Sequence, residues 1–193
     1  MNFDELKKQT LNKMLFDDKS NKGSVDEPIK KLLKKINSLD NYYSTSSCSG
    51  RIIIIRIPKS GKKKEAEFIF RTHKKVTVKE VAKVVKNIDS TDAVWFRQEP
   101  AIIHVAARTL KDASVFLRIA RRIGFKRSGI FEVEKRFLME LVSTERIDSI
   151  ISKNGVVLVS DDYIKVLVQQ ANKHLEKTWD KISKLKNNLN LVT

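Results

Sequence analysis

The stretch that decides the fold runs from Tyr42 to Ile57, Y-Y-S-T-S-S-C-S-G-R-I-I-I-I-R-I, where small polar residues meet four consecutive isoleucines. Ile52 to Ile55 are β-branched and apolar, which predicts a buried strand. Before it lie hydroxyls and a thiol, Gly50 permits a turn, and Arg51 adds a permanent cation. Two interpretations follow: a loop that binds an anionic or polar ligand, or a Ser-rich hairpin turn.

The composition indicates a folded protein with a polyanionic partner. The chain has 193 residues, 41% of them hydrophobic, and 39 Lys and Arg against 23 Asp and Glu give a net charge of +16. Such an excess favours nucleic acid, with a membrane surface as the rival. No apolar run approaches the ~20 residues of a spanning helix, and the first residues do not resemble a signal peptide. We therefore expect a cytoplasmic protein.

Two kinds of site are disfavoured by the residue types. One cysteine, Cys48, excludes an internal disulfide and a Cys-based zinc site, and His73, His104 and His174 are too far apart for a metal motif, so we expect no metal. Neither a glycine-rich dinucleotide-binding turn nor a P-loop is present. A nucleophilic Cys48 activated by His73 or His104 stays open, although a histidine inside an apolar strand is more often structural.

The pattern along the chain predicts an α+β fold. We expect amphipathic helices within 1–38, the second capped by Ser24 and Glu27, a strand-rich core over 42–159, and a long helix over 161–190. Helices opened by Thr77 and Thr109 interrupt the core. The prediction is one domain, 1–193, with a mixed, largely antiparallel sheet and packed terminal helices. Similar strand ends near 68–72 and 105–109 are compatible with an internal duplication.

Five separated motifs resemble one known family. They are K-G-S-V-D-E at 22–27, S-S-C-S-G-R at 46–51, T-H-K at 72–74, the E-P, H-V and R of 99–108, and G-F-K-R-S-G-I at 124–130. Together they are similar to the tRNA wybutosine-synthesizing protein 3 family, the tRNA 4-demethylwyosine methyltransferases. The resemblance implies an S-adenosylmethionine-dependent enzyme, not of the Rossmann type, that methylates a ring nitrogen of the tricyclic base beside the anticodon of phenylalanine tRNA.

The chemistry of such a methyl transfer suggests roles for individual residues. Methyl transfer to nitrogen depends mainly on positioning the two reactants, with a base of modest strength to remove a proton. We expect His104, Glu99 and Asp26 to serve the chemistry. The cofactor would be bound by residues of the two Ser-Gly segments and an early carboxylate: Ser46, Ser47, Cys48, Ser49, Gly50, Arg51, Ser128, Gly129 and Asp17.

The cations of the third helix and its flanks are the predicted RNA contacts. They could neutralise phosphates around a presented anticodon base. The set is Lys22, Arg108, Arg118, Arg121, Arg122, Lys126 and Arg127. Trp95 and Phe96 could stack on bases, although strand aromatics usually belong to the core. The competing hypotheses are a non-catalytic RNA-binding protein and an assembly protein that uses the long C-terminal helix.

Overall fold

The computed structural model describes residues 2–16 and 25–191, which form helices and two antiparallel sheets. The helices are α1 (Phe3–Phe16), α2 (Glu27–Asn37), α3 (Val78–Lys86), α4 (Leu110–Ile123) and α5 (Asp161–Asn188). The strands are β1 (Tyr42–Cys48), β2 (Arg51–Ile57), β3 (Glu67–Thr72), β4 (Ala93–Glu99), β5 (Ile102–Ala107), β6 (Gly129–Glu132), β7 (Phe137–Val142), β8 (Ile147–Lys153) and β9 (Val156–Val157). Single 3-10 turns occur at Lys63–Glu65 and Leu189–Leu191. The α+β class is confirmed.

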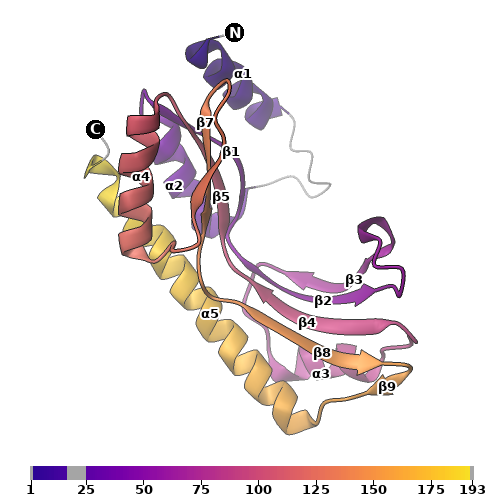
Figure 1. Ribbon diagram of the computed structural model, residues 1–193. Helices are drawn as coiled ribbons and strands as arrows, with labels where there is room; N and C mark the ends of the chain where they lie inside the picture. The colour runs from indigo at the N-terminus through magenta and orange to yellow at the C-terminus, as the bar shows by residue number, and fades with distance from the viewer. Residues whose placement is uncertain (1, 17–24, 192–193) are drawn as a thin grey trace. The chain divides into compact units, whose positions relative to one another are not determined.

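The chain divides into two compact units, each with its own sheet (Figure 1). Unit 1 comprises residues 1–49, 101–144 and 178–193, and its strand order is β1-β5-β7-β6. Unit 2 comprises residues 50–100 and 145–177, with the order β3-β2-β4-β8-β9. The prediction of one mixed sheet was wrong in detail, because the strand pairs of the described residues are all antiparallel and fall into two sheets. The single domain and the internal duplication stay predictions.

The Ser-rich stretch before the isoleucines is itself a strand. Residues 42–48 pair antiparallel with β5, whereas residues 51–57 pair with β3 and β4 in the other sheet. The hairpin interpretation was therefore wrong. Gly50, at φ 90°, lies between the two strands and adopts a backbone conformation that other residues resist, so the chain changes sheets at this residue.

The core of unit 1 lies on one side of its sheet. Helices α2, α4 and the last turns of α5 pack there (Figure 1). Ile29, Leu32 and Ile36 of α2 share one buried cluster with Ile182 and Leu185 of α5. Their packing confirms that a helix near each end of the chain contributes to the same core.

The other side of this sheet is covered over part of its area. Phe3 of α1 packs there against Tyr43, Ala106 and Leu138. Arg108 holds α1 in place, because its guanidinium donates hydrogen bonds to Asp4 and stands over the Phe3 ring. The rest of this face carries the residues of the candidate site.

Helix ends follow the predicted caps where these lie in the described residues. Thr77 and Thr109 both form reciprocal capping boxes, with Glu80 and Asp112 respectively. Gly124 ends α4 at φ 124°, a backbone conformation that favours glycine. Helix α2 begins at Glu27 with Asp26 as its N-cap, whereas the predicted cap, Ser24, lies outside the described residues.

Candidate functional site

Four residues form a row across all four strands of the unit 1 sheet. Ser46 on β1 lies opposite His104 on β5, His104 lies opposite Glu140 on β7, and Glu140 lies opposite Gly129 on β6. Residues directly opposite each other in antiparallel strands project to the same face. The row therefore places a hydroxyl, an imidazole and a carboxylate side by side on the face that does not carry the main core.

The three side chains of this row are joined by hydrogen bonds. Ser46 Oγ is 2.8 Å from His104 Nδ1, and His104 Nε2 is 3.0 Å from a carboxylate oxygen of Glu140. An ionised carboxylate only accepts hydrogen bonds, so His104 Nε2 carries the proton and donates a hydrogen bond to Glu140. In a neutral imidazole Nδ1 then accepts from the Ser46 hydroxyl. Glu140 thus fixes the ring in the tautomer whose free lone pair points at Ser46.

An exposed aromatic ring borders the row. The Phe131 ring centroid lies 5.1 Å from that of His104, and this phenylalanine is 55% exposed. A side chain built at Gly129 would meet no atom within 4 Å, so the space above the β6 end of the row is open. Ile102 on β5 adds a partly exposed apolar surface. A planar group could stack on Phe131 while its polar edge reaches Ser46, His104 or Glu140.

Asp26 organises the end of β1. Its carboxylate accepts from the backbone N–H of Ser49 at 2.8 Å and from the Ser49 hydroxyl at 2.9 Å. Charge-assisted bonds of this kind are among the stronger hydrogen bonds in proteins. Asp26 therefore ties the first turn of α2 to the end of the Ser-rich strand. Its predicted role in the chemistry is untested, and the contacts of Asp26 assign it to positioning.

Ser128 and Arg121 have structural contacts that the sequence did not reveal. The buried Ser128 hydroxyl donates to the Phe125 carbonyl and accepts from the Val142 N–H, and Arg121 donates two hydrogen bonds to the Ser128 carbonyl. These bonds fix the turn between α4 and β6 and so set the position of Gly129. Of the predicted Ser-Gly pair, only Gly129 belongs to the row.

The remaining predicted cofactor residues divide between the units. Ser47 lies on β1 opposite Ile103, and Cys48 lies opposite Ile102, beside the row of Ser46 and His104. Gly50 and Arg51 belong to unit 2, where Arg51 Nε donates to Glu99 at 2.5 Å. Glu99, predicted to serve the chemistry, is therefore not part of the row, and its role stays a prediction. The predicted Asp17 lies outside the described residues.

The predicted RNA contacts on α4 are exposed. Arg118 and Arg122 lie on its outer surface, and Lys126 and Arg127 on the following turn. A groove of about 480 Å³ runs beside them, lined by Leu110, Ser114, Leu117, Arg118, Arg121 and Ile130. Arg108, in contrast, is engaged with Asp4 and Asn41, which assigns it to holding α1. Lys22 lies outside the described residues.

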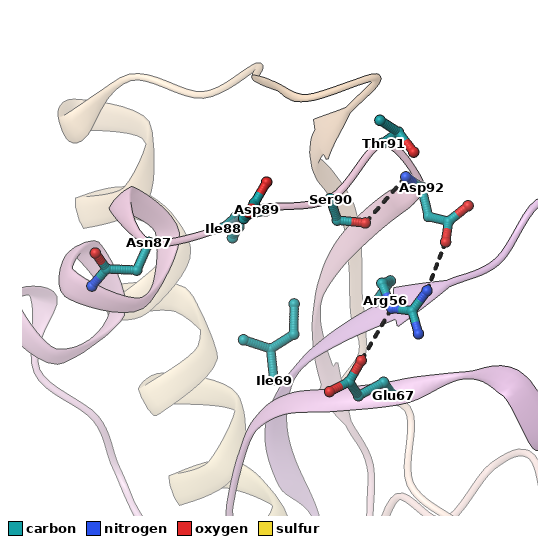
Figure 2. A pocket seen from close by; sticks show the side chains of 9 residues that line it. All are labelled: Arg56, Glu67, Ile69, Asn87, Ile88, Asp89, Ser90, Thr91 and Asp92. Carbon is teal, nitrogen blue, oxygen red and sulfur yellow. Dashed lines mark hydrogen bonds and ion pairs between the residues drawn. The ribbon is translucent and has the colours of Figure 1, made fainter.

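Another hollow lies in unit 2, near the loop that follows α3 (Figure 2). It measures about 550 Å³, and its lining is mainly polar. Its one arginine, Arg56, is held between Glu67 and Asp92, and Asp89 adds a further carboxylate to the lining. These ion pairs occupy the guanidinium, so the hollow does not suit a phosphate or another anion.

Two residues of the unit 1 site, Glu140 and Phe131, escaped the predictions made from sequence. Glu140 is a single carboxylate inside the apolar strand F-L-M-E-L-V, which was a detectable signal. A charge in such a strand needs a partner or a position on an open face. Phe131 offered no comparable signal, because an aromatic residue in a strand usually belongs to the core.

The fold and the row describe an α+β protein with a polar, partly aromatic site on an open sheet face. The family described as "Methyltransferase TYW3" matches residues 5–191. The chain belongs to this methyltransferase family, which confirms the resemblance. No helix within residues 2–16 and 25–191 is long and apolar enough to span a bilayer.

Individual relatives agree with this membership. A Pyrococcus furiosus protein named "tRNA(Phe) 7-((3-amino-3-carboxypropyl)-4-demethylwyosine(37)-N(4))-methyltransferase 1" is 39% identical and covers 99% of this chain and 96% of its own length. A Xenopus laevis "tRNA wybutosine-synthesizing protein 3 homolog" is 36% identical over 94% of this chain and 72% of its own length. A solved structure from Pyrococcus horikoshii superposes with a TM-score of 0.91 at 37% identity, covering 100% of this chain and 96% of that one.

Proposed function

We propose that this chain is an S-adenosylmethionine-dependent tRNA methyltransferase. Its substrate would be phenylalanine tRNA, and the acceptor a ring nitrogen of the 4-demethylwyosine-type tricyclic base beside the anticodon, in wybutosine biosynthesis. The observation that carries this proposal is the similarity to the Pyrococcus furiosus enzyme over 99% of the chain, since that enzyme is named for this acceptor. The charge of +16 supports a polyanionic substrate.

The residues of the unit 1 site fit the methyl donor by their chemistry. Phe131 offers a ring face for the adenine of S-adenosylmethionine. Glu140 and Ser46 offer acceptors for the hydroxyl and amino groups of the same molecule. Gly129 leaves open space beside them. When bound, S-adenosylmethionine supplies an electrophilic methyl group on a sulfonium centre.

The row of Ser46, His104 and Glu140 would manage the proton of the acceptor nitrogen. A ring N–H that gains a methyl group must lose its proton during the reaction. The Ser46 hydroxyl can accept a hydrogen bond from that N–H and pass a proton to His104 Nδ1, while Glu140 stabilises the imidazolium that results. Because Glu140 already orients the ring, this transfer needs little rearrangement.

Transfer of labelled methyl groups tests the proposal. Purified chain is incubated with S-adenosylmethionine labelled in its methyl group and with phenylalanine tRNA that carries the demethylated tricyclic base. We expect about one methyl group per tRNA on that base and none on the same tRNA with an unmodified guanosine. Methylation of both tRNAs, or of other nucleotides, would show that the proposed substrate is wrong.

A second measurement separates an enzyme from a non-catalytic RNA-binding protein. A ligand that binds only the folded state raises the melting temperature, by an amount that grows with its concentration. We expect S-adenosylmethionine to do so in the absence of tRNA. Tight tRNA binding without this shift and without methyl transfer would favour the RNA-binding alternative.

A further inference from the structure

Unit 2 carries a second open sheet face with an unusual composition. The buried residues of β4 alternate strictly with half-exposed ones, so this strand has one covered and one open side. On the covered side, Gln98 is fully buried, and its side-chain oxygen lies 3.0 Å from the imidazole of His174 on α5. Residues 95, 97 and 99 project to the opposite side. We call this side, with its neighbours on β2, β3 and β8, the arginine–aromatic face.

The register places its side chains in adjacent rows. One row contains Arg71 on β3, Arg97 on β4 and Asp148 on β8, with Ile53 of β2 between the two arginines. The neighbouring row contains Phe68, Trp95 and Ile150, with Ile55 of β2 between the two aromatic residues. Cations and aromatic rings thus lie in parallel across the sheet.

Each aromatic ring is in contact with guanidinium groups. The guanidinium carbons of Arg51 and Arg71 lie 5.3 and 5.2 Å from the Phe68 ring centroid, and that of Arg97 lies 5.0 Å from the Trp95 ring. Phe68 is nevertheless 43% exposed. A planar group can therefore reach the ring beside the guanidinium of Arg71, whereas that of Arg51 is paired with Glu99.

The charge of this face favours an anion. Four arginines, at positions 51, 71, 97 and 146, stand beside two carboxylates, Glu99 and Asp148. Arg71 contacts the Phe68 ring. Lys59, Lys62 and Lys64 lie in the connection between β2 and β3, shortly before Phe68, and Glu65 in the same connection pairs with Lys62. The cations are thus in excess where the exposed ring lies.

We infer that the arginine–aromatic face binds unpaired nucleotides of RNA. Bases would stack on Phe68 and Trp95, and phosphates would pair with Arg71. Arg51 and Arg97 are already paired with Glu99 and Asp148, and they hold their guanidinium groups against the two rings. Stacking on an aromatic side chain accepts every base, whereas arginine binds phosphate with a planar, forked set of donors. This site differs in composition from the α4 cations, which have no exposed ring among them in the described residues. The inference rests on the proposed function only in taking RNA as the substrate.

Binding assays that do not depend on methyl transfer test the inference, using the complete chain and two probes. The first is a single-stranded RNA oligonucleotide of mixed sequence, and the second is heparin, a polyanion without bases. Phe68→Ala should weaken RNA binding about tenfold, the lower range for loss of one stacked base, and leave heparin binding unchanged. The matched control, Phe68→Tyr, keeps the ring and should bind RNA as the wild type does. Arg71→Ala should weaken binding of both probes.

A spectroscopic readout covers the case in which Phe68→Ala fails to fold. The chain has two tryptophans, so Trp179→Phe leaves Trp95 as the single reporter. A base stacked on Trp95 should quench its fluorescence, and heparin should not. Unchanged fluorescence at saturating RNA, or wild-type RNA affinity in folded Phe68→Ala, would overturn the inference. Because neither readout involves methyl transfer, both remain decisive even if the proposed reaction is wrong.

Discussion

Ser46 and His104 lie directly opposite each other on β1 and β5, and the serine Oγ is 2.8 Å from the imidazole Nδ1. They are separated by 58 residues in sequence. Their pairing depends on the register of the two strands, and Glu140 completes it from a third strand. If this row manages the acceptor proton, its members should affect the rate of methyl transfer rather than the affinity for tRNA.

Removal of the imidazole tests that role. His104→Ala should lower the single-turnover rate of methyl transfer about 100-fold, the lower range for loss of a general base, with tRNA affinity unchanged. Glu140→Gln should have a smaller effect of the same kind, because it leaves the imidazole in place but removes the charge that orients it. Glu132→Gln is the matched control, since that carboxylate pairs with Arg136. A wild-type rate in His104→Ala would exclude His104 from the chemistry.

The bond between Asp26 and Ser49 should stabilise the fold. Asp26→Ala leaves two donors of Ser49 without their acceptor, so we expect a loss of about 2 kcal/mol in the free energy of unfolding, measured by urea denaturation. The exposed Asp89→Ala serves as control and should change it little. Ser49→Ala should lower the free energy of unfolding less in the Asp26→Ala variant than in the wild type. Strict additivity of the two substitutions would show that the pair is not coupled.

The ion pair between Asp4 and Arg108 predicts a pH effect on α1. The hydrogen bond from Arg108 lowers the pKa of Asp4 below its ordinary value. A carboxylate with a depressed folded-state pKa stabilises the protein above its unfolded pKa, and loses that contribution as the pH falls through the folded value. Stability should therefore decrease below about pH 4 more in the wild type than in Asp4→Asn. Thermal unfolding across this range, with Glu5→Gln as control, measures the difference.

The exposed cations of α4 and the following turn should contribute to tRNA affinity, and the salt dependence of binding measures this contribution. Replacing Arg118, Arg122 and Arg127 by alanine spares Arg121, whose bonds to Ser128 are structural. If these cations meet phosphates, the slope of log affinity against log salt should fall by about 0.7–0.9 for each phosphate that is no longer neutralised. The control removes three exposed lysines of α5, Lys173, Lys177 and Lys184. A change of slope only in the control would move the RNA-binding surface to α5.

Local patterns were sufficient for most helices. The apolar stripe of α5, from Ile164 to Leu185, is buried along its length as its spacing predicted. The caps at Thr77 and Thr109 were also predictable from the sequence, because a capping box involves residues only three positions apart. Both features depend on neighbours in the chain, so the sequence alone determines them.

The strands show where local patterns fail. The four isoleucines predicted β2, but the small polar residues of β1 predicted a loop or a turn. Ser44 to Cys48 form a strand because β5 supplies hydrogen-bond partners for their backbone, a contact that their own propensity does not predict. Two sheets in place of one follow from the same pairing.

The motifs of this chain determined its family and its charge excess indicated a polyanionic partner, since both are properties of the sequence itself. The site required the tertiary structure. The sequence singled out Ser46 and His104 but not Glu140 or Phe131, and it suggested a chemical role for Asp26 where the structure shows a bond to Ser49. Only the register of antiparallel strands decides which distant side chains share a face, and a shift of one residue would have separated every member of the row.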